Sequence, residues 1–141
     1  MDGKRPTALI LAPFDGAWGA VHKAVVAALE EDGVAVVWLN ANAEPDAAAG
    51  PRIHDYLDEA DVVVADLSEA NPNVMYEMGY AHALRKPVLP VIERHRERVP
   101  SSLRGRLFFV YDRSNPTELI AFVGRWMERY LAESKVEERV G

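Results

Sequence analysis

Two carboxylates lie close together in the sequence and could act on the same small molecule. Glu77 falls in the first two turns of an expected helix, and Asp66 ends the apolar run that precedes it. The positive end of a helix dipole favours an ionised carboxylate, so Glu77 could act as a nucleophile or stabilise a neighbouring cation. Two carboxylates around one cleft suit cleavage of a glycosidic bond, where Asp66 would handle a proton or hold a sugar hydroxyl. We therefore consider both acids as candidate catalytic residues.

Polar groups between the two acids could hold a substrate. Ser68, Asn71, Asn73 and the backbone N–H groups of a helix start are suited to binding sugar hydroxyls or a phosphate. Helix capping explains Asn71 and Asn73 equally well, and a strand-end residue such as Asp66 often only forms a turn. Both interpretations stay open from the residues alone.

The four histidines give little indication of metal binding. His82 lies just over one turn beyond Glu77 and could face the substrate from the same side, although packing explains it more simply. His22, His54 and His95 have no spacing typical of metal ligands. The sequence contains no Cys, which excludes thiolate ligands and a thiol nucleophile. We expect no metal and no cofactor.

Hydrophobic patterns predict the elements that position these residues. Strands are expected at residues 7–12, 34–39, 62–65, 87–92 and 107–111, and helices at residues 17–32, 52–60, 72–85 and 116–131. Asn71 as N-cap and Pro72 in the first turn begin the third helix, and Gly33 ends the first. Pro90 predicts a bulge or an edge position in its strand. The charged residues 132–141 are expected to fray.

Strands that alternate with helices predict an α/β fold with a parallel sheet covered on both faces. We favour a flavodoxin-like three-layer sandwich with five strands in the order 2-1-3-4-5. In that order the winding reverses between the first and third strands, and ligands bind in the crevice at their carboxyl ends. Its walls would be Phe14, Asp15 and Gly16 on one side and the segment from Asp66 to Asn73 on the other.

Composition limits the protein class. A length of 141 residues favours one domain over residues 1–141, and 49% hydrophobic residues suffice for a core. The net charge of -6 argues against nucleic acid as a partner. No apolar run approaches the roughly 20 residues that a membrane helix needs. We expect a soluble, cytoplasmic protein without a membrane partner.

A basic segment follows the fourth expected strand. It carries five arginines and one histidine between Arg94 and Arg106. The segment could attract a phosphate or close over the site as a lid. A solvated loop whose charges offset Glu93 and Glu97 is the simpler interpretation.

The sequence resembles a known family at these residues. The segment Pro13-Phe14-Asp15 and the block ADVVVADLSEANPNVMYEMGYAHALRKPVLPVI, from Ala60 to Ile92, are similar to the nucleoside 2-deoxyribosyltransferase-like superfamily, in its TIR-like or nucleotide N-glycosidase branch. The resemblance implies a flavodoxin-like fold and cleavage or transfer of an N-glycosidic bond of a nucleotide, nucleoside or NAD. It also implies a homo-oligomer, because members often complete their sites across a subunit interface.

The same resemblance assigns roles to individual residues. The family's catalytic carboxylate falls on Glu77 and its strand-end acid on Asp66. Residues that touch the sugar or phosphate fall on Asn71 and Asn73, and the substrate-holding first loop falls on residues 14–16.

Two positions differ from the family's nucleotide hydrolases. Their additional Asp, in the helix before the central strand, is replaced by Ile53, and their glycine-rich first loop by Pro-Phe-Asp-Gly. These differences leave NAD or another nucleotide open as the substrate. The alternative function is a non-catalytic TIR-like domain for nucleotide sensing or signalling. An FMN-binding or receiver domain is less favoured, because a Ser/Thr-rich phosphate loop and paired phosphoacceptor acids are missing.

Overall fold

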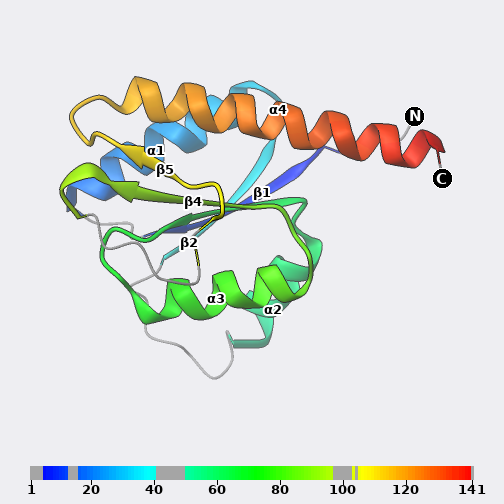
Figure 1. Cartoon of the computed structure of the whole chain (residues 1–141), viewed down its shortest axis with the longest axis horizontal. Coiled ribbons are helices and arrows are strands. Elements are labelled where there is room, and N and C mark those ends of the chain that lie inside the picture. Colours follow the sequence, from blue (N-terminus) through cyan, green and yellow to red (C-terminus); the bar gives the residue numbers. More distant parts are fainter. Residues whose placement is uncertain (1–4, 13–15, 41–49, 97–102, 104, 141) are drawn as a thin grey trace.

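The protein folds around one parallel sheet (Figure 1). The structure is a computed structural model that describes residues 5–12, 16–40, 50–96, 103 and 105–140. The strands are β1 (Thr7–Ala12), β2 (Ala35–Asn40), β3 (Val62–Asp66), β4 (Val88–Glu93) and β5 (Phe109–Tyr111). They are parallel and lie in the order β2-β1-β3-β4-β5, which confirms the predicted topology.

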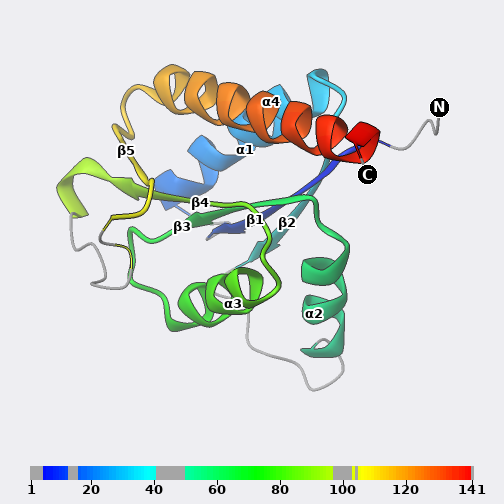
Figure 2. The ribbon, with the colours of Figure 1, turned by 45° about the vertical axis from the view of Figure 1, so that its right-hand side comes forward.

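Helices cover both faces of the sheet, as predicted for strands that alternate with helices. They are α1 (Gly16–Glu31), α2 (Gly50–Glu59), α3 (Pro72–Ala83) and α4 (Pro116–Val140), with a short 3-10 helix η1 (Arg94–Arg96) after β4. Figures 1 and 2 show α1 and α4 together on one face and α2 and α3 on the other. The predicted α/β sandwich is therefore confirmed.

The central strand β3 is buried on both faces, as its unbroken apolar run indicates. Val62 and Val64 belong to the apolar cluster under α1 and α4. Val63 and Ala65 belong to the cluster under α2 and α3. Because side chains alternate along a strand, Asp66 then points to the α1 and α4 side.

Local signals place the ends of two helices. Asn71 is the N-cap of α3, with its side chain accepting a 2.8 Å hydrogen bond from the Asn73 N–H, and Pro72 is the first helical residue. Gly33 follows α1 with φ of 86°, a left-handed conformation that glycine adopts without a steric penalty. The predicted caps are confirmed at both sites.

Two elements at the end of the chain differ from expectation. α4 continues to Val140, so the expected helix end near residue 131 was wrong; residues 132–140 lack Gly and Pro and include several good helix formers. β5 begins only at Phe109, which pairs with Val91. Pro90 pairs with Ala65 on the β3 side and lies before the first β5 pair. Pro90 lacks an N–H, and this is tolerated because no β5 residue pairs with β4 at that position.

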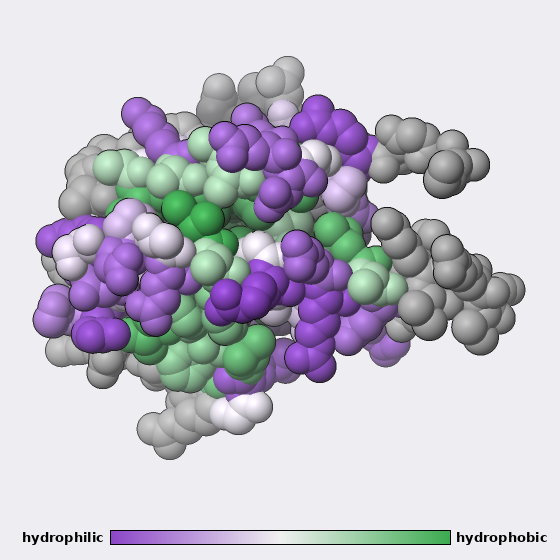
Figure 3. All heavy atoms as spheres, turned by 90° about the horizontal axis from the view of Figure 1, so that it is seen from above, coloured by the Kyte–Doolittle hydropathy of each residue, from purple (hydrophilic) through white to green (hydrophobic). Residues whose placement is uncertain are grey.

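The outer surface mixes residue types. Figure 3 shows the molecule from above relative to its orientation in Figure 1. On this face, which carries α4, hydrophobic residues are visible among hydrophilic ones. The partly buried side chains that pack against the core there include Ile120 and Phe122, whereas Trp126 is only 5% exposed. Among the described helices, none combines the length and apolar character needed to cross a bilayer.

Candidate active site

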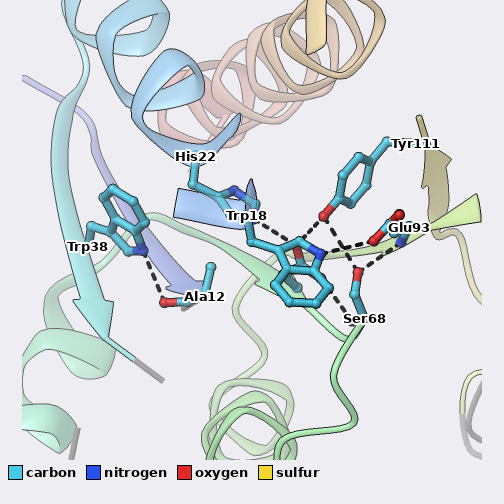
Figure 4. A network of polar contacts seen from close by, with 8 residues as sticks. Ala12, Trp18, His22, Trp38, Ser68, Glu93 and Tyr111 are labelled. Carbon is cyan, nitrogen blue, oxygen red and sulfur yellow. Dashed lines mark hydrogen bonds and ion pairs between the residues drawn. The ribbon is translucent and has the colours of Figure 1, made fainter. Parts of the chain in front are cut away.

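A polar network joins the carboxyl ends of three strands to the start of α1. Asp66 ends β3, Glu93 ends β4 and Tyr111 ends β5. Trp18 and His22 come from the first two turns of α1. Figure 4 shows the side chains of Trp18, His22, Glu93 and Tyr111 converging at one edge of the sheet. This is the edge at which ligands bind in parallel α/β sheets.

Asp66 is the centre of this network. Its Oδ2 atom lies 2.6 Å from Nε2 of His22 and accepts a 2.7 Å hydrogen bond from the Tyr111 hydroxyl. Its Oδ1 atom accepts a 2.8 Å hydrogen bond from the Ser68 N–H. Burial by itself would raise the pKa of Asp66, but the hydrogen bond and charge of His22, with the bonds from Ser68 and Tyr111, lower it below its usual value. Asp66 is therefore a fixed anion, and it is only 3% exposed.

Tyr111 is kept as a neutral phenol. Burial and the nearby Asp66 carboxylate both raise the pKa of the Tyr111 hydroxyl far above its ordinary value. The neutral hydroxyl can therefore donate its hydrogen bond to Asp66. This arrangement stabilises the anion without using a second charge.

Glu93 and Ser68 connect β4 to the network. The Ser68 Oγ accepts a 2.8 Å hydrogen bond from the Glu93 N–H, and the Trp18 Nε1–H donates to Oε2 of Glu93 over 3.1 Å. Arg113 lies 3.9 Å from Oε1 of Glu93 and over the Trp18 ring. Glu93 is only 4% exposed and is a buried member of this network, with Trp18 and Arg113 as its described side-chain partners.

Glu77 lies on the opposite layer and in a different environment. It is half-buried on α3, and no hydrogen bond or ion pair joins it to another described residue. Burial raises the pKa of Glu77 from 4.5 to about 7. The expectation that the helix dipole favours its ionised form was wrong, because Glu77 is the sixth helical residue and the dipole effect fades within the first turn.

The two candidate carboxylates are thus separated by the sheet. Asp66 contacts α1 and β5 on one face, whereas α3 packs its buried residues on the other. Asp66 has three described hydrogen-bond contacts and is suited to fixing the local geometry.

The remaining predicted site residues have different surroundings. Ser68 is 7% exposed and is used within the network. Asn71 caps α3, and Asn73 is an exposed residue in the first turn. Gly16 begins α1, while Phe14 and Asp15 lie outside the described residues.

His82 is placed away from Glu77. Five residues apart on a helix, the two side chains differ by about 140° around the axis. His82 lines a pocket with Lys86, Arg106 and residues of β4, and Glu77 is not among the residues that line it.

Sequence reasoning missed several members of the network. His22, Glu93 and Tyr111 were not predicted as site residues, although each ends a strand or lies in the helix that follows one. The rule that identified Asp66, namely a polar residue at a strand's carboxyl end, also applies to Glu93 and Tyr111. Within the described ranges, no three His, Asp or Glu side chains are grouped as metal ligands would be.

Comparison with known proteins gives consistent similarities. A sequence model described as nucleoside 2-deoxyribosyltransferase matches residues 14–116. A 5-hydroxymethyl-dUMP N-hydrolase of Rattus norvegicus is 32% identical over 129 residues, covering 81% of this chain and 78% of that protein. The protein of the same name from Mus musculus is also 32% identical, with 81% and 74% covered.

Solved structures show the same fold at lower identity. The CMP N-glycosidase BcmB of Clostridium botulinum superposes with a TM-score of 0.67 at 17% identity, covering 84% of this chain and 98% of that one. A 2-deoxyribosyltransferase of Bacillus psychrosaccharolyticus gives 0.53 at 16% identity, with 77% and 88% covered. A receiver protein of Burkholderia phymatum gives 0.58 at 16% identity, with 84% and 92% covered, so the fold alone does not decide function.

Proposed function

Because the chain belongs to the nucleoside 2-deoxyribosyltransferase family, we propose that it hydrolyses the N-glycosidic bond of a pyrimidine nucleoside 5′-monophosphate, with Glu77 as the catalytic carboxylate. Family membership makes the protein an enzyme of N-glycosidic bonds. Both the 32% identical relatives and the CMP N-glycosidase of similar fold are named for pyrimidine nucleoside monophosphates. These names support the choice of substrate class.

The environment of Glu77 carries the assignment of the catalytic group. A half-buried carboxylate without a described partner keeps its lone pairs available, and its pKa of about 7 leaves a substantial ionised fraction at neutral pH. A poorly solvated carboxylate also has less hydration to lose when it approaches a sugar carbon. Glu77 follows Tyr76 in the YEMG segment, which is where the family places its catalytic acid.

The proposed reaction has two balanced steps. The ionised Glu77 attacks C1′ of the sugar as the bond between C1′ and the base nitrogen breaks, and the base leaves with the bonding electron pair and takes up a proton. Water then attacks C1′, gives its proton to solvent and releases Glu77 as a carboxylate. The products are the free base and a pentose 5-phosphate. A second base in place of water would give transfer instead of hydrolysis.

Asp66 is proposed to act through its neighbours. Its contact with the Ser68 N–H fixes the turn that leads from β3 toward α3. Ala70, in the same turn, has φ of 51°, a conformation that costs a non-glycine residue on the order of 1 kcal/mol. The Asp66 network stabilises this turn, and α3 then holds Glu77 at its position.

The test is chromatography of a substrate panel incubated with the purified protein. The panel contains nucleoside and deoxynucleoside monophosphates, free nucleosides and NAD, each with and without a second base. We expect a free base from a pyrimidine monophosphate and none with Glu77→Gln. Glu30→Gln, an exposed position on α1, is the matched control and should retain activity.

The outcomes separate the alternatives. Nicotinamide release would move the substrate to NAD, and base exchange would indicate a transferase. Thermal stabilisation by a nucleotide without any product would support the sensing domain. Full activity in Glu77→Gln would exclude Glu77 as the catalytic group.

A further inference from the structure

The pocket lined by His82 lies away from the carboxyl edge. It has a volume of about 230 Å³ and is formed by the end of α3, the first half of β4, the segment before β5 and the middle of α4. Its lining residues are His82, Lys86, Pro87, Val88, Pro90, Arg106, Leu107, Trp126 and Tyr130. None of these residues belongs to the Asp66 network, and Glu77 is not among them.

The short β5 strand explains why the pocket exists. β4 pairs with β5 only from Val91 onward, so its first half has no partner on that side within the described residues. The hydrogen bonds from Val63 N–H to Pro87 O and from Leu67 N–H to Val91 O direct the odd-numbered residues of this strand toward β3. Val88 and Pro90 then present their backbone groups to the open side. Pro90 has no N–H to donate, which prevents the ladder from extending there.

The charged groups of the pocket are all cations. Lys86 and Arg106 lie on its wall, and no Asp or Glu is among the lining residues in the part of the chain that the structure describes. Burial and the charge of Arg106 lower the pKa of His82, so at neutral pH the positive charges are those of Lys86 and Arg106. Lys86 donates one hydrogen bond of 2.7 Å to the Asp58 carbonyl and has further N–H groups to give. The described charges on the pocket wall are thus positive, although the chain as a whole has a net charge of -6.

The remaining wall is largely apolar and carries two aromatic side chains. The rings of Trp126 and Tyr130 lie 4.9 Å apart at 59° to each other, and Leu107 is 57% exposed beside them. The Trp126 Nε1–H is buried and has no hydrogen-bond partner among the described residues. The pocket therefore offers aromatic surface and hydrogen-bond donors together with positive charge.

We propose that this pocket is a binding site for a small planar aromatic anion, with its ring against Trp126 and Tyr130 and its phosphate, carboxylate or sulfonate group at Lys86 and Arg106. Arginine and lysine suit such oxyanions, and burying a ring against aromatic side chains adds apolar contact. The site is separate from the Glu77 reaction. Glu77 is not among its lining residues, so this proposal does not depend on the proposed function.

The indole N–H signals of the three tryptophans provide the test. In a ¹⁵N-labelled sample, phenyl phosphate is titrated while the indole resonances of Trp18, Trp38 and Trp126 are followed. We expect a saturable shift of the Trp126 signal with the other two unchanged. Inorganic phosphate alone and the neutral ring of benzyl alcohol should each bind at least about 5-fold more weakly, because each lacks one half of the proposed interaction.

Matched variants test the assigned cations. Arg106→Gln and Lys86→Gln should each weaken phenyl phosphate binding about 5- to 10-fold, whereas Arg125→Gln, an exposed cation next to Trp126 that does not line the pocket, should leave it unchanged. Equal affinity of phenyl phosphate for all three variants, or Trp126 shifts with benzyl alcohol as large as those with phenyl phosphate, would overturn the anion site. A Trp126 signal that does not move with any of the three probes would overturn the pocket as a binding site altogether.

Discussion

The hydroxyl of Tyr111 donates a 2.7 Å hydrogen bond to Oδ2 of Asp66, although the two residues are 45 positions apart in the chain. The contact joins the ends of β3 and β5, which have β4 between them in the sheet. It is one of three described contacts that hold the Asp66 carboxylate as an anion, with His22 and the Ser68 N–H. The carboxyl edge is therefore fixed before any substrate arrives.

Removing this hydroxyl should destabilise the fold. Tyr111→Phe leaves Oδ2 of Asp66 with one donor fewer in a buried site, which we expect to cost about 1–3 kcal/mol of the free energy of unfolding. Urea denaturation measured by circular dichroism gives the value. Tyr56→Phe, at an exposed position on α2, is the control and should change stability by less than about 0.5 kcal/mol. A loss no larger than the control's would contradict the role given to this contact.

The ionisation of Glu77 should set the pH dependence of the reaction. Burial raises its pKa to about 7, and a nucleophile must be deprotonated. We expect kcat/KM for the best pyrimidine monophosphate to rise tenfold per pH unit well below 7 and to level off above about 8. Initial rates between pH 5 and 9 measure this, and the substrate's own phosphate ionisation is checked with a phosphonate analogue. Activity that falls as pH rises through 7 would instead indicate that the protonated acid is the working form.

The raised pKa of Glu77 also predicts how the stability of the fold depends on pH. The direction is opposite to that for an acid whose pKa is lowered by an ion pair. Because the pKa of Glu77 is raised from 4.5 to about 7 in the folded state, its contribution to stability is fully present below pH 4.5 and is lost as pH rises to 7. The full shift would correspond to about 3.4 kcal/mol. Partial exposure screens the group, so we expect about 1–2 kcal/mol.

Glu77→Gln should therefore be more stable than the parent at pH 8 and equally stable near pH 4.5. Urea denaturation at the two pH values measures the difference. Glu30→Gln, on the exposed side of α1, should show no such pH-dependent gain. A gain of the same size at both pH values would assign the effect to packing and not to charge.

Two glycines should respond to substitution in opposite ways. Gly79 lies within α3, and a methyl group added to its Cα would meet nothing within 4 Å, so Gly79→Ala should stabilise the protein by about 0.5–1 kcal/mol through helix propensity. Gly33 is equally open but has φ of 86°, so Gly33→Ala should destabilise it by about 1 kcal/mol. Thermal unfolding of both variants gives the comparison. Stabilisation by Gly33→Ala would contradict the left-handed cap assigned to it.

The sequence alone determined the order of the elements and several of their ends. The unbroken apolar run of β3, the Asn71 and Pro72 helix start and Gly33 are local signals, and each acts through backbone preferences of a few adjacent residues. The strand order followed because short right-handed crossovers leave few arrangements for alternating strands and helices. The family block around Glu77 also singled out that carboxylate without any knowledge of its surroundings.

Only the tertiary structure decided which polar groups meet. His22 and Tyr111 reach Asp66 from α1 and β5, and no local pattern relates them to it, whereas the Ser68 N–H belongs to the local turn after β3. The half-burial that raises the pKa of Glu77 depends on how α3 packs against the sheet. The place of His82 in the pocket between α3, β4 and α4 depends on where β5 begins. Each of these results from contacts between distant segments, which local backbone preferences do not encode.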